Sequence, residues 1–363
     1  MRGRTAAARA LRAHGAGFAF AILAGAAAAG AAVLLGRLVP RFSFRSRVVV
    51  ITGGSRGLGI LLARELSRRG ARVVINARDA DELQAARAEL REGGGDAEAY
   101  AADVSDPVHA DRLIREVIAR YDRIDVLINN AGIIQVAPLA QMSLADFEQA
   151  QAVNFWGMVH TTLAALPQMR ARRAGRVVNV TSIGGAVAVP HLLPYSAAKF
   201  AALGFSEGLA AETARDGVRV TTVVPGLMRT GSFVNALFKG QREREAAWFS
   251  VASSLPLLSM DGRRAARRIL AACARGQSFL TLGLPAKLLR LFHGLLPGTT
   301  VRLLGLANAL LPRPGGAGPQ AAAEPGWQHR TGVARSFLTA LGDKAARANR
   351  EVRWAPPASG APR

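Results

Sequence analysis

The sequence contains a single cysteine, Cys273, and aromatic residues make up only 6% of its 363 residues. One cysteine excludes a disulfide-held scaffold, and Cys273 has no cysteine or histidine partner at metal-ligand spacing, so no metal site is expected. Half of the residues are hydrophobic, which excludes intrinsic disorder, and no repeat is visible. We therefore expect one large or two ordinary domains with a full core, in which Cys273 is a packed thiol.

Acidic residues are scarce: 25 Asp and Glu stand against 47 Lys and Arg, a formal net charge of +22, and only four of the cations are lysines. The excess lies at the ends, because residues 1–47 hold eight arginines and no acid, and residues 281–363 hold 11 basic and three acidic residues. Residues 48–280 are closer to neutral, with 28 basic and 22 acidic residues. Such a charge is typical of a nucleic-acid partner, but both basic ends are also apolar, which favours a membrane surface instead.

One uncharged run lies near the N-terminus. The 22 residues from Gly15 to Gly36 are enough to cross a bilayer core of about 30 Å. Fifteen of the 22 are Ala or Gly, so the run is only weakly apolar. A membrane anchor is favoured, with a cleaved signal peptide and a soluble Ala-rich helix as alternatives. Arginines flank both sides, so the charges do not predict an orientation.

Between Arg47 and about Leu284, short apolar runs alternate with longer helical stretches. Continuous apolar strands separated by helices predict an α/β fold with a doubly wound, Rossmann-type parallel sheet in a single catalytic domain, 47–284. The expected buried strands are Val48–Ile51, Val73–Ile75, Ile124–Ile128, Val177–Val180, Val218–Val224 and Phe279–Leu282. The expected helices are 57–69, 79–92, 106–121, 141–171, 195–215 and 261–275.

Two extensions flank this domain, the basic N-terminus 1–46 and the C-terminal residues 285–363. In the latter, amphipathic stretches on either side of Pro297-Gly298 predict a helical hairpin with a cationic face. The hairpin could lie on anionic lipid, or pack against another subunit. Residues 312–326, rich in Pro, Gly and Ala, predict a flexible linker, and 333–350 predict a last, cationic helix.

A glycine-rich turn follows the first expected strand and leads directly into a helix. Its sequence is Thr52-Gly53-Gly54-Ser55-Arg56-Gly57-Leu58-Gly59. Glycines let the backbone approach a pyrophosphate, and a helix N-terminus offers N–H groups and partial positive charge to it. The turn therefore predicts a dinucleotide site, with a plain strand-to-helix turn as the alternative.

The end of the second strand bears on the choice of dinucleotide. Dinucleotide sites often hold an acid there for a ribose hydroxyl, but this chain has Ala77 followed by Arg78. An acid would repel a 2′-phosphate, whereas an arginine can bind it with two hydrogen bonds. Together with Arg56, Arg78 favours NADP(H) over NAD(H), although arginine is so common here that the pair is not decisive.

Tyr195 and Lys199 stand four residues apart, hence on one face of a helix. A free phenol has a pKa near 10, so a tyrosine working as acid or base near neutrality needs roughly 4 kcal/mol of phenolate stabilisation. A nearby ammonium group can supply much of it. Ser182, at the carboxyl end of a strand, could hold a substrate carbonyl oxygen, or be an ordinary loop or capping serine.

Together these residues resemble the classical short-chain dehydrogenase/reductase (SDR) family, over about residues 47–284. The catalytic domain matches the family in an ordered series of motifs. They are the glycine motif at 52–59, Asp103 after the third strand, Asn129-Asn130-Ala131-Gly132, Asn154, Ser182, Tyr195-x-x-x-Lys199, Pro225-Gly226 and Thr230.

The resemblance implies a role for each matched residue. Tyr195 would be the proton donor or acceptor, Lys199 would lower its pKa and hold the nicotinamide ribose, Ser182 would orient the carbonyl, and Asn154 would support a water-linked proton path. Asp103 would meet the adenine and Thr230 the carboxamide. The full set of expected cofactor contacts is Thr52, Gly53, Ser55, Arg56, Gly57, Leu58, Gly59, Arg78, Asp103, Val104, Asn130, Ala131, Gly132, Tyr195, Lys199, Pro225, Gly226 and Thr230.

The apolar segment 231–260 usually closes over the substrate in this family. It predicts a lipophilic carbonyl or alcohol, with helix packing or a dimer contact as the alternative. His191, four residues before Tyr195, could touch substrate or be a loop histidine. We thus expect an NADP(H)-dependent carbonyl reductase or alcohol dehydrogenase, and the resemblance implies a homo-oligomer. We expect the enzyme to be membrane-associated with its active site facing the cytoplasm, and the alternative is a cytoplasmic enzyme. The alternative from another class is a non-catalytic NADPH-binding membrane scaffold or sensor.

Overall fold

The computed structural model describes residues 42–316 and 318–352. Contacts divide the chain into Met1–Phe42 and Ser43–Arg363, and the fold described here is that of the second unit. The predicted anchor, residues 15–36, lies outside the described residues. Among the helices that are described, none combines the length and the apolar character needed to cross a membrane.

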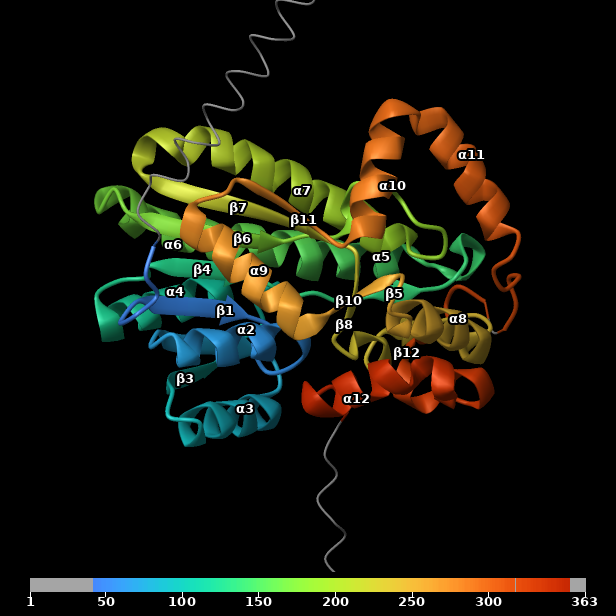
Figure 1. Cartoon of the computed structure of the whole chain (residues 1–363), viewed down its shortest axis with the longest axis horizontal. Coiled ribbons are helices and arrows are strands. Elements are labelled where there is room, and N and C mark those ends of the chain that lie inside the picture. Colours follow the sequence, from blue (N-terminus) through green and yellow to red (C-terminus); the bar gives the residue numbers. More distant parts are fainter. Residues whose placement is uncertain (1–41, 317, 353–363) are drawn as a thin grey trace, which may run out of the picture. The chain divides into compact units, whose positions relative to one another are not determined.

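A seven-stranded parallel sheet forms the centre of the fold, in the order β11-β7-β6-β4-β1-β2-β3 (Figure 1). This is the predicted doubly wound arrangement, in which the strand order reverses beside β1. The strands are β1 (Val48–Thr52), β2 (Arg72–Ala77), β3 (Asp96–Ala101), β4 (Val126–Asn129), β6 (Gly175–Val180), β7 (Val218–Pro225) and β11 (Phe279–Leu282).

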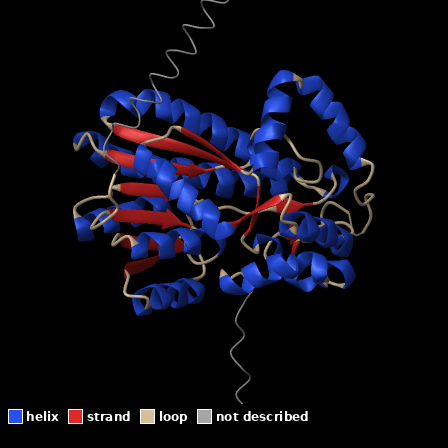
Figure 2. Ribbon diagram, in the orientation of Figure 1, coloured by secondary structure: helices blue, strands red, loops and turns tan. Residues whose placement is uncertain are grey.

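Helices cover both faces of the sheet (Figure 2). On one face α2 packs against α3 and α9, and on the other α4 packs against α6, and α5 against α7. Parallel strands need such cover, because each is apolar on both sides. The helices are α2 (Gly57–Arg68), α3 (Ala80–Glu92), α4 (Pro107–Tyr121), α5 (Leu144–Gln151), α6 (Gly157–Ala171), α7 (Leu193–Thr213) and α9 (Gly262–Arg275).

The predicted strands and helices of the domain are confirmed, except that one helix is interrupted; the edge strand β3, a helix over Arg242–Ser254 and several short strands were not predicted. The list of expected strands omits β3, which lies at the edge of the sheet and buries only Ala97 fully, so no apolar run marks it. The single helix expected over 141–171 is interrupted by a π-helical turn, Ala152–Trp156, between α5 and α6. Cys273 is buried in α9, and burial raises the pKa of its thiol to about 12, as expected for a packed thiol.

The C-terminal extension begins with the predicted hairpin, α10 (Leu284–Leu295) and α11 (Pro297–Asn308). The stretch predicted to be a linker is tied to the domain, because Lys239 Nζ donates to Pro319 O at 2.6 Å and β12 (Glu324–Pro325) pairs with β9 (Leu237–Phe238). The helix predicted over 333–350 is shorter, since two 3-10 turns precede α12 (Ala340–Ala348). Smaller elements are β5 (Gln135–Val136), β8 (Leu227–Arg229), α8 (Arg242–Ser254) and β10 (Ser259–Asp261).

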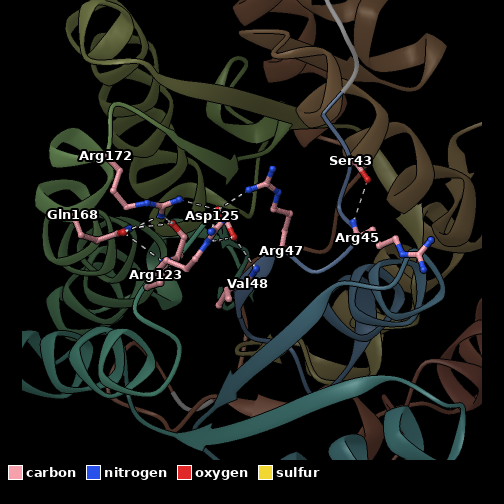
Figure 3. Close-up of polar contacts among 9 residues, drawn as sticks. Ser43, Arg45, Arg47, Val48, Arg123, Asp125, Gln168 and Arg172 are labelled. Atoms are coloured by element: carbon pink, nitrogen blue, oxygen red, sulfur yellow. Dashed lines mark hydrogen bonds and ion pairs between the residues drawn. The ribbon is translucent and has the colours of Figure 1, made fainter.

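A buried carboxylate fixes the amino edge of the sheet. Asp125 accepts a hydrogen bond from Val48 N at 3.0 Å and binds Arg123 at 2.6 Å and Arg172 at 3.2 Å, as Figure 3 shows. Arg47 lies 3.5 Å from the same carboxylate. Burial acts to raise the pKa of Asp125, but the hydrogen bonds from Arg123, Val48 and Arg172 hold it below its ordinary value.

We expect Asp125→Ala to lower the free energy of unfolding by about 3 kcal/mol, because it leaves the buried Val48 amide without its acceptor and the partly exposed Arg123 and Arg172 without their shared carboxylate. Urea unfolding measures this loss. The control Asp96→Ala removes an ion pair with Arg72 in which both side chains are exposed. It should lower the free energy of unfolding by less than about 1 kcal/mol. The wild-type contribution is present above the ordinary aspartate pKa near 4 and is lost as the pH falls below it. Equal urea midpoints for the two variants would contradict the assignment.

Candidate active site

A cavity of about 890 Å³ opens at the carboxyl edge of the central sheet. It is bordered by the segments that follow β1, β2, β4, β6 and β7, where ligands of doubly wound sheets bind. Every predicted site residue lines this cavity except Thr52 and Gly59, which lie just behind it. The structure therefore brings together residues that are far apart in the sequence.

The glycine-rich turn forms one wall of the cavity. Gly53 has a φ of +63°, and a Cβ there would stand 2.8 Å from Ala131 Cα, so only glycine fits between β1 and β4. A Cβ on Gly59 would collide with Gly53 O, which explains how α2 packs so closely on the turn. These two glycines allow the N-terminus of α2 to face the cavity.

Thr52 and Asn130 join the turns after β1 and β4. The Thr52 hydroxyl accepts hydrogen bonds from the amides of Asn130 and Ala131 at 3.0 and 3.1 Å. The Asn130 side chain donates in return to Thr52 O and Gly53 O at 3.1 and 2.9 Å. Thr52, predicted as a cofactor contact, thus serves here to hold the cavity floor rigid.

The two arginines expected to read a 2′-phosphate have different surroundings. Arg56 binds Glu82 at 3.1 Å and lies 3.7 Å from Glu351. Arg78 is 57% exposed, and its nearest carboxylate, Asp103, is 3.9 Å away. The charge of Arg56 is therefore offset by two acids, whereas Arg78 is the more available cation.

Tyr195 and Lys199 project from the first turns of α7 toward the cavity. Lys199 is 4% exposed, its Nζ donates to Val180 O at 3.1 Å, and the same atom lies 5.8 Å from the centre of the Tyr195 ring. Burial lowers the pKa of Lys199 to about 8. The ammonium group therefore begins to lose its proton in a physiologically accessible range.

The phenol of Tyr195 differs from the expectation. Burial raises the pKa of Tyr195 above its ordinary value, and a hydrogen bond with Ser182 offsets only part of the rise. Lys199 Nζ, expected to lower this pKa, is bonded to Val180 O and lies beside the Tyr195 ring. At neutral pH Tyr195 is accordingly a protonated donor, the form that a carbonyl reduction requires.

Ser182 and Asn154 are held by backbone contacts. Ser182 follows β6 and its hydroxyl accepts from Gly184 N at 3.0 Å, so it also caps a 3-10 turn. Asn154 lies in the π-helical turn, a feature frequent at functional sites, and bonds both ways to Ile133 at 3.1 and 3.2 Å. A Cβ on Gly132 would meet Asn154 Oδ1 at 2.7 Å, so Gly132 lets these groups approach.

The segment expected to close over the substrate lines part of the cavity. Trp248, Phe249 and Leu258 line it, and Phe249 also packs with Phe233 and Phe238 in one buried cluster behind the wall. His191 is not on the wall: it is buried, and its Nδ1 lies 2.9 Å from Glu245, which also accepts from Trp248 Nε1 at 2.7 Å. His191 therefore supports Trp248 from behind.

Two acidic residues beside Arg56 were not anticipated, Glu82 and Glu351. Both line the cavity and flank Arg56. Glu82 lies in the first turn of α3, three residues after the N-cap Asp79. Its closeness in sequence to Arg78 is the one signal that could have indicated an acid at this end of the cavity. Glu351 lies in the C-terminal extension and carries no local signal.

Comparison with known proteins agrees with this geometry. Residues 47–239 match the family described as short chain dehydrogenase. The chain belongs to the short-chain dehydrogenase family. It is therefore an enzyme of the oxidoreductase class, as predicted, with the predicted Rossmann-type fold.

Individual members of the short-chain dehydrogenase family show how far the likeness extends. The 3-oxoacyl-[acyl-carrier-protein] reductase of Synechocystis is 37% identical over 51% of this chain and 75% of its own. The 11-beta-hydroxysteroid dehydrogenase A of Sesamum indicum is 34% identical over 65% of this chain and 68% of its own. The structure of a gluconate 5-dehydrogenase from Burkholderia cenocepacia in complex with NADP and tartrate has a TM-score of 0.60 at 28% identity, covering 68% of this chain and 97% of that one.

The cavity suits the nicotinamide dinucleotide of a short-chain dehydrogenase. The glycine-rich turn brings the N-terminus of α2 to the cavity, and one continuous wall runs from Arg78 to Tyr195. The fit is incomplete at Gly57, where the Glu351 carboxylate takes the space that a Cβ would fill.

Proposed function

We propose that this short-chain dehydrogenase transfers hydride between NADP(H) and a lipophilic carbonyl or alcohol, with reduction as the favoured direction. The observation that supports this proposal most strongly is that Tyr195, Ser182 and Lys199 line the same cavity as the glycine-rich turn. The bound dinucleotide would supply the hydride. The protein would supply the proton and the orientation of the substrate.

The proposed steps use four side chains. Ser182 donates a hydrogen bond to the substrate oxygen and so orients the carbonyl. Tyr195 gives its hydroxyl proton to that oxygen as the alkoxide charge develops. The Lys199 ammonium stabilises the phenolate that remains and holds the ribose. Asn154 keeps the turn at Ile133 in place, and the water-linked path expected through it stays a prediction.

The preference for NADP(H) rests on Arg78, which is the more available of the two cations. We expect Arg78→Asp to reduce the ratio of NADPH to NADH affinity about 100-fold, close to 2.7 kcal/mol, because a charge-assisted contact is replaced by repulsion. Fluorescence titrations with both dinucleotides measure the ratio. Arg112→Asp, on the outer surface of α4, is the matched control. An unchanged ratio in Arg78→Asp would show that this arginine does not read the phosphate.

The lipophilic substrate class is supported by the side chains around the catalytic end of the cavity. Trp248, Phe249 and Leu258 come from the segment 231–260, and Leu289 comes from α10. Apolar walls favour apolar ligands by about 25 cal/mol per Å² buried. The two relatives reported above carry names that refer to an acyl chain and a steroid, which agrees with this class.

A membrane surface is the proposed partner of the α10–α11 hairpin. Residues 284–311 contain no acidic residue, and Lys287, Arg290 and Arg302 lie among apolar side chains. Ten large apolar residues of 284–311 are exposed: Leu284, Leu288, Leu291, Phe292, Leu295, Leu296, Val301, Leu303, Leu306 and Leu310. Because α10 also borders the cavity, docking would bring lipid beside the substrate site. NADPH use favours a catalytic domain that faces the cytoplasm.

We expect the full chain to float with anionic lipid vesicles. Removing residues 1–36 should leave part of the binding, because the hairpin remains, and adding Leu291→Glu and Leu295→Glu to that variant should abolish it. The control Leu144→Glu, at an exposed leucine of α5, should not affect flotation. If the full chain stays unbound at low salt, the membrane proposal fails.

A screen of ketones, aldehydes, quinones and alcohols with NADPH or NADP, in detergent, tests the function itself. Turnover of lipophilic members supports the proposal, and turnover of polar sugars alone would overturn the substrate class. Binding of NADPH without oxidation by any member would favour the alternative, a non-catalytic NADPH-binding scaffold or sensor. Assembly as a homo-oligomer stays a prediction.

A further inference from the structure

The C-terminal segment 340–352, called the strap below, lies against the cofactor wall of the cavity. Figure 1 shows its helix, α12, beside α8, and Gly342 and Ala346 pack against Phe233 and Gly231. Beyond α12, residues 349–352 run across the N-terminus of α2. Nothing in the sequence of the strap predicts this position.

Backbone hydrogen bonds place the strap on the predicted cofactor contacts. The amide of Gly57 donates to Asn349 O at 2.8 Å. The Asn349 side chain donates to Thr230 O at 3.0 Å. The strap thus engages residues expected at the two ends of the dinucleotide, the phosphate turn and the carboxamide contact.

The carboxylate of Glu351 lies beside the N-terminus of α2, next to Arg56 and Gly57. Its side chain is 5% exposed, lies 3.7 Å from Arg56 Nε and accepts a hydrogen bond from Asn235 Nδ2 at 2.7 Å. Its carboxylate occupies the space beside Gly57 that a Cβ would fill. A helix N-terminus is an anion-binding site, and here a carboxylate is the anion.

We propose that the strap is autoinhibitory: Glu351 and the Asn349 carbonyl compete with the diphosphate of the dinucleotide for the N-terminus of α2 and Arg56. The inference rests on the proposed dinucleotide binding. The diphosphate and the carboxylate are both anions, so they exclude one another by charge as well as by volume. Cofactor binding therefore displaces residues 349–352.

Two features lower the cost of displacing the end of the strap. Burial raises the pKa of Glu351 to about 7, with Arg56 and Asn235 opposing the rise and Glu82 adding to it. Near neutrality this side chain is divided between a neutral form and a charged form that is costly to bury. Arg350 adopts a φ of +61°, a left-handed backbone conformation that is unfavourable for a residue other than glycine.

Affinity for NADPH, measured by fluorescence titration, tests the strap on the full chain and on two truncated chains. Ending the chain after Ala348 removes the competing groups and leaves α12, so the dissociation constant should fall at least about 10-fold. Ending it after Val352 should leave the constant unchanged. Glu351→Gln should lower it a few-fold, and the control Asp343→Asn, a strap acid paired with Arg330, should not change it.

Hydrogen exchange gives a second readout that does not depend on turnover. The Glu351 amide, which donates to Ala346 O at 2.9 Å, should exchange faster when NADPH is bound to the full chain. Equal or weaker NADPH binding by the chain ending at Ala348, or slower exchange of residues 349–352 with NADPH, would overturn the inference alone. Failure of every folded variant to bind NADPH or NADH would instead overturn the proposed function.

Discussion

Replacing Tyr195 with phenylalanine should lower kcat about 1,000-fold while leaving NADPH affinity within a few-fold of wild type. The substitution keeps the ring and removes only the hydroxyl that would protonate the substrate oxygen. General acid catalysis typically contributes 10²–10⁴ in rate, which sets the size of the expected loss. Steady-state turnover of a lipophilic ketone, together with NADPH titration, measures both quantities.

The chain offers a matched control for this variant. It has three tyrosines, and Tyr121 ends α4, away from the cavity. Tyr121→Phe should keep wild-type turnover. Turnover of Tyr195→Phe within a few-fold of wild type would refute the assigned role of Tyr195.

Lys199→Met should lower kcat about 100-fold and weaken NADPH binding, because the phenolate and the ribose lose their cation. The pH profile adds a sharper test. Burial lowers the pKa of Lys199 to about 8, so its charge is present below that pH and is lost above it. The pKa of Tyr195 is raised, so the phenol keeps its proton across the same range. Wild-type reduction should therefore decline as the pH rises through about 8, and the variant should show no such decline.

A second buried lysine, Lys239, provides a control that distinguishes an effect on catalysis from an effect on stability. Lys239 is also nearly fully buried, binds Asp146 at 2.7 Å, and does not line the cavity. Lys239→Met should lower the thermal midpoint and yet retain the wild-type pH profile. If Lys199→Met kept both turnover and the decline near pH 8, another group would be responsible for it.

The sheet could be predicted wherever local composition reflects burial. All five residues of β1 are buried, and its continuous apolar run predicts a buried strand. By contrast β3 is an edge strand that fully buries only Ala97, and it has the sequence of a surface segment. The π-helical turn that holds Asn154 has no signature in the local sequence.

That the residues proposed to be catalytic line one cavity could be predicted, because each lies at a fixed point of a motif. The place of Glu351 could not be predicted, since its contacts with Arg56 and Gly57 join opposite ends of the chain and depend on where α12 docks. The position of Lys199 Nζ on Val180 O is likewise a matter of tertiary packing. Spacing alone placed Lys199 beside the Tyr195 phenol, and the structure places it beside the ring.

Transfer of deuterium tests the central claim most directly. The enzyme would be incubated with a lipophilic ketone and NADPH carrying deuterium on one face of C4, and the product examined by mass spectrometry and NMR. The account predicts an alcohol with one deuterium on the carbinol carbon for one C4 epimer of the cofactor and none for the other, with formation abolished in Tyr195→Phe. An alcohol without deuterium from either epimer, or equal formation by Tyr195→Phe, would contradict it.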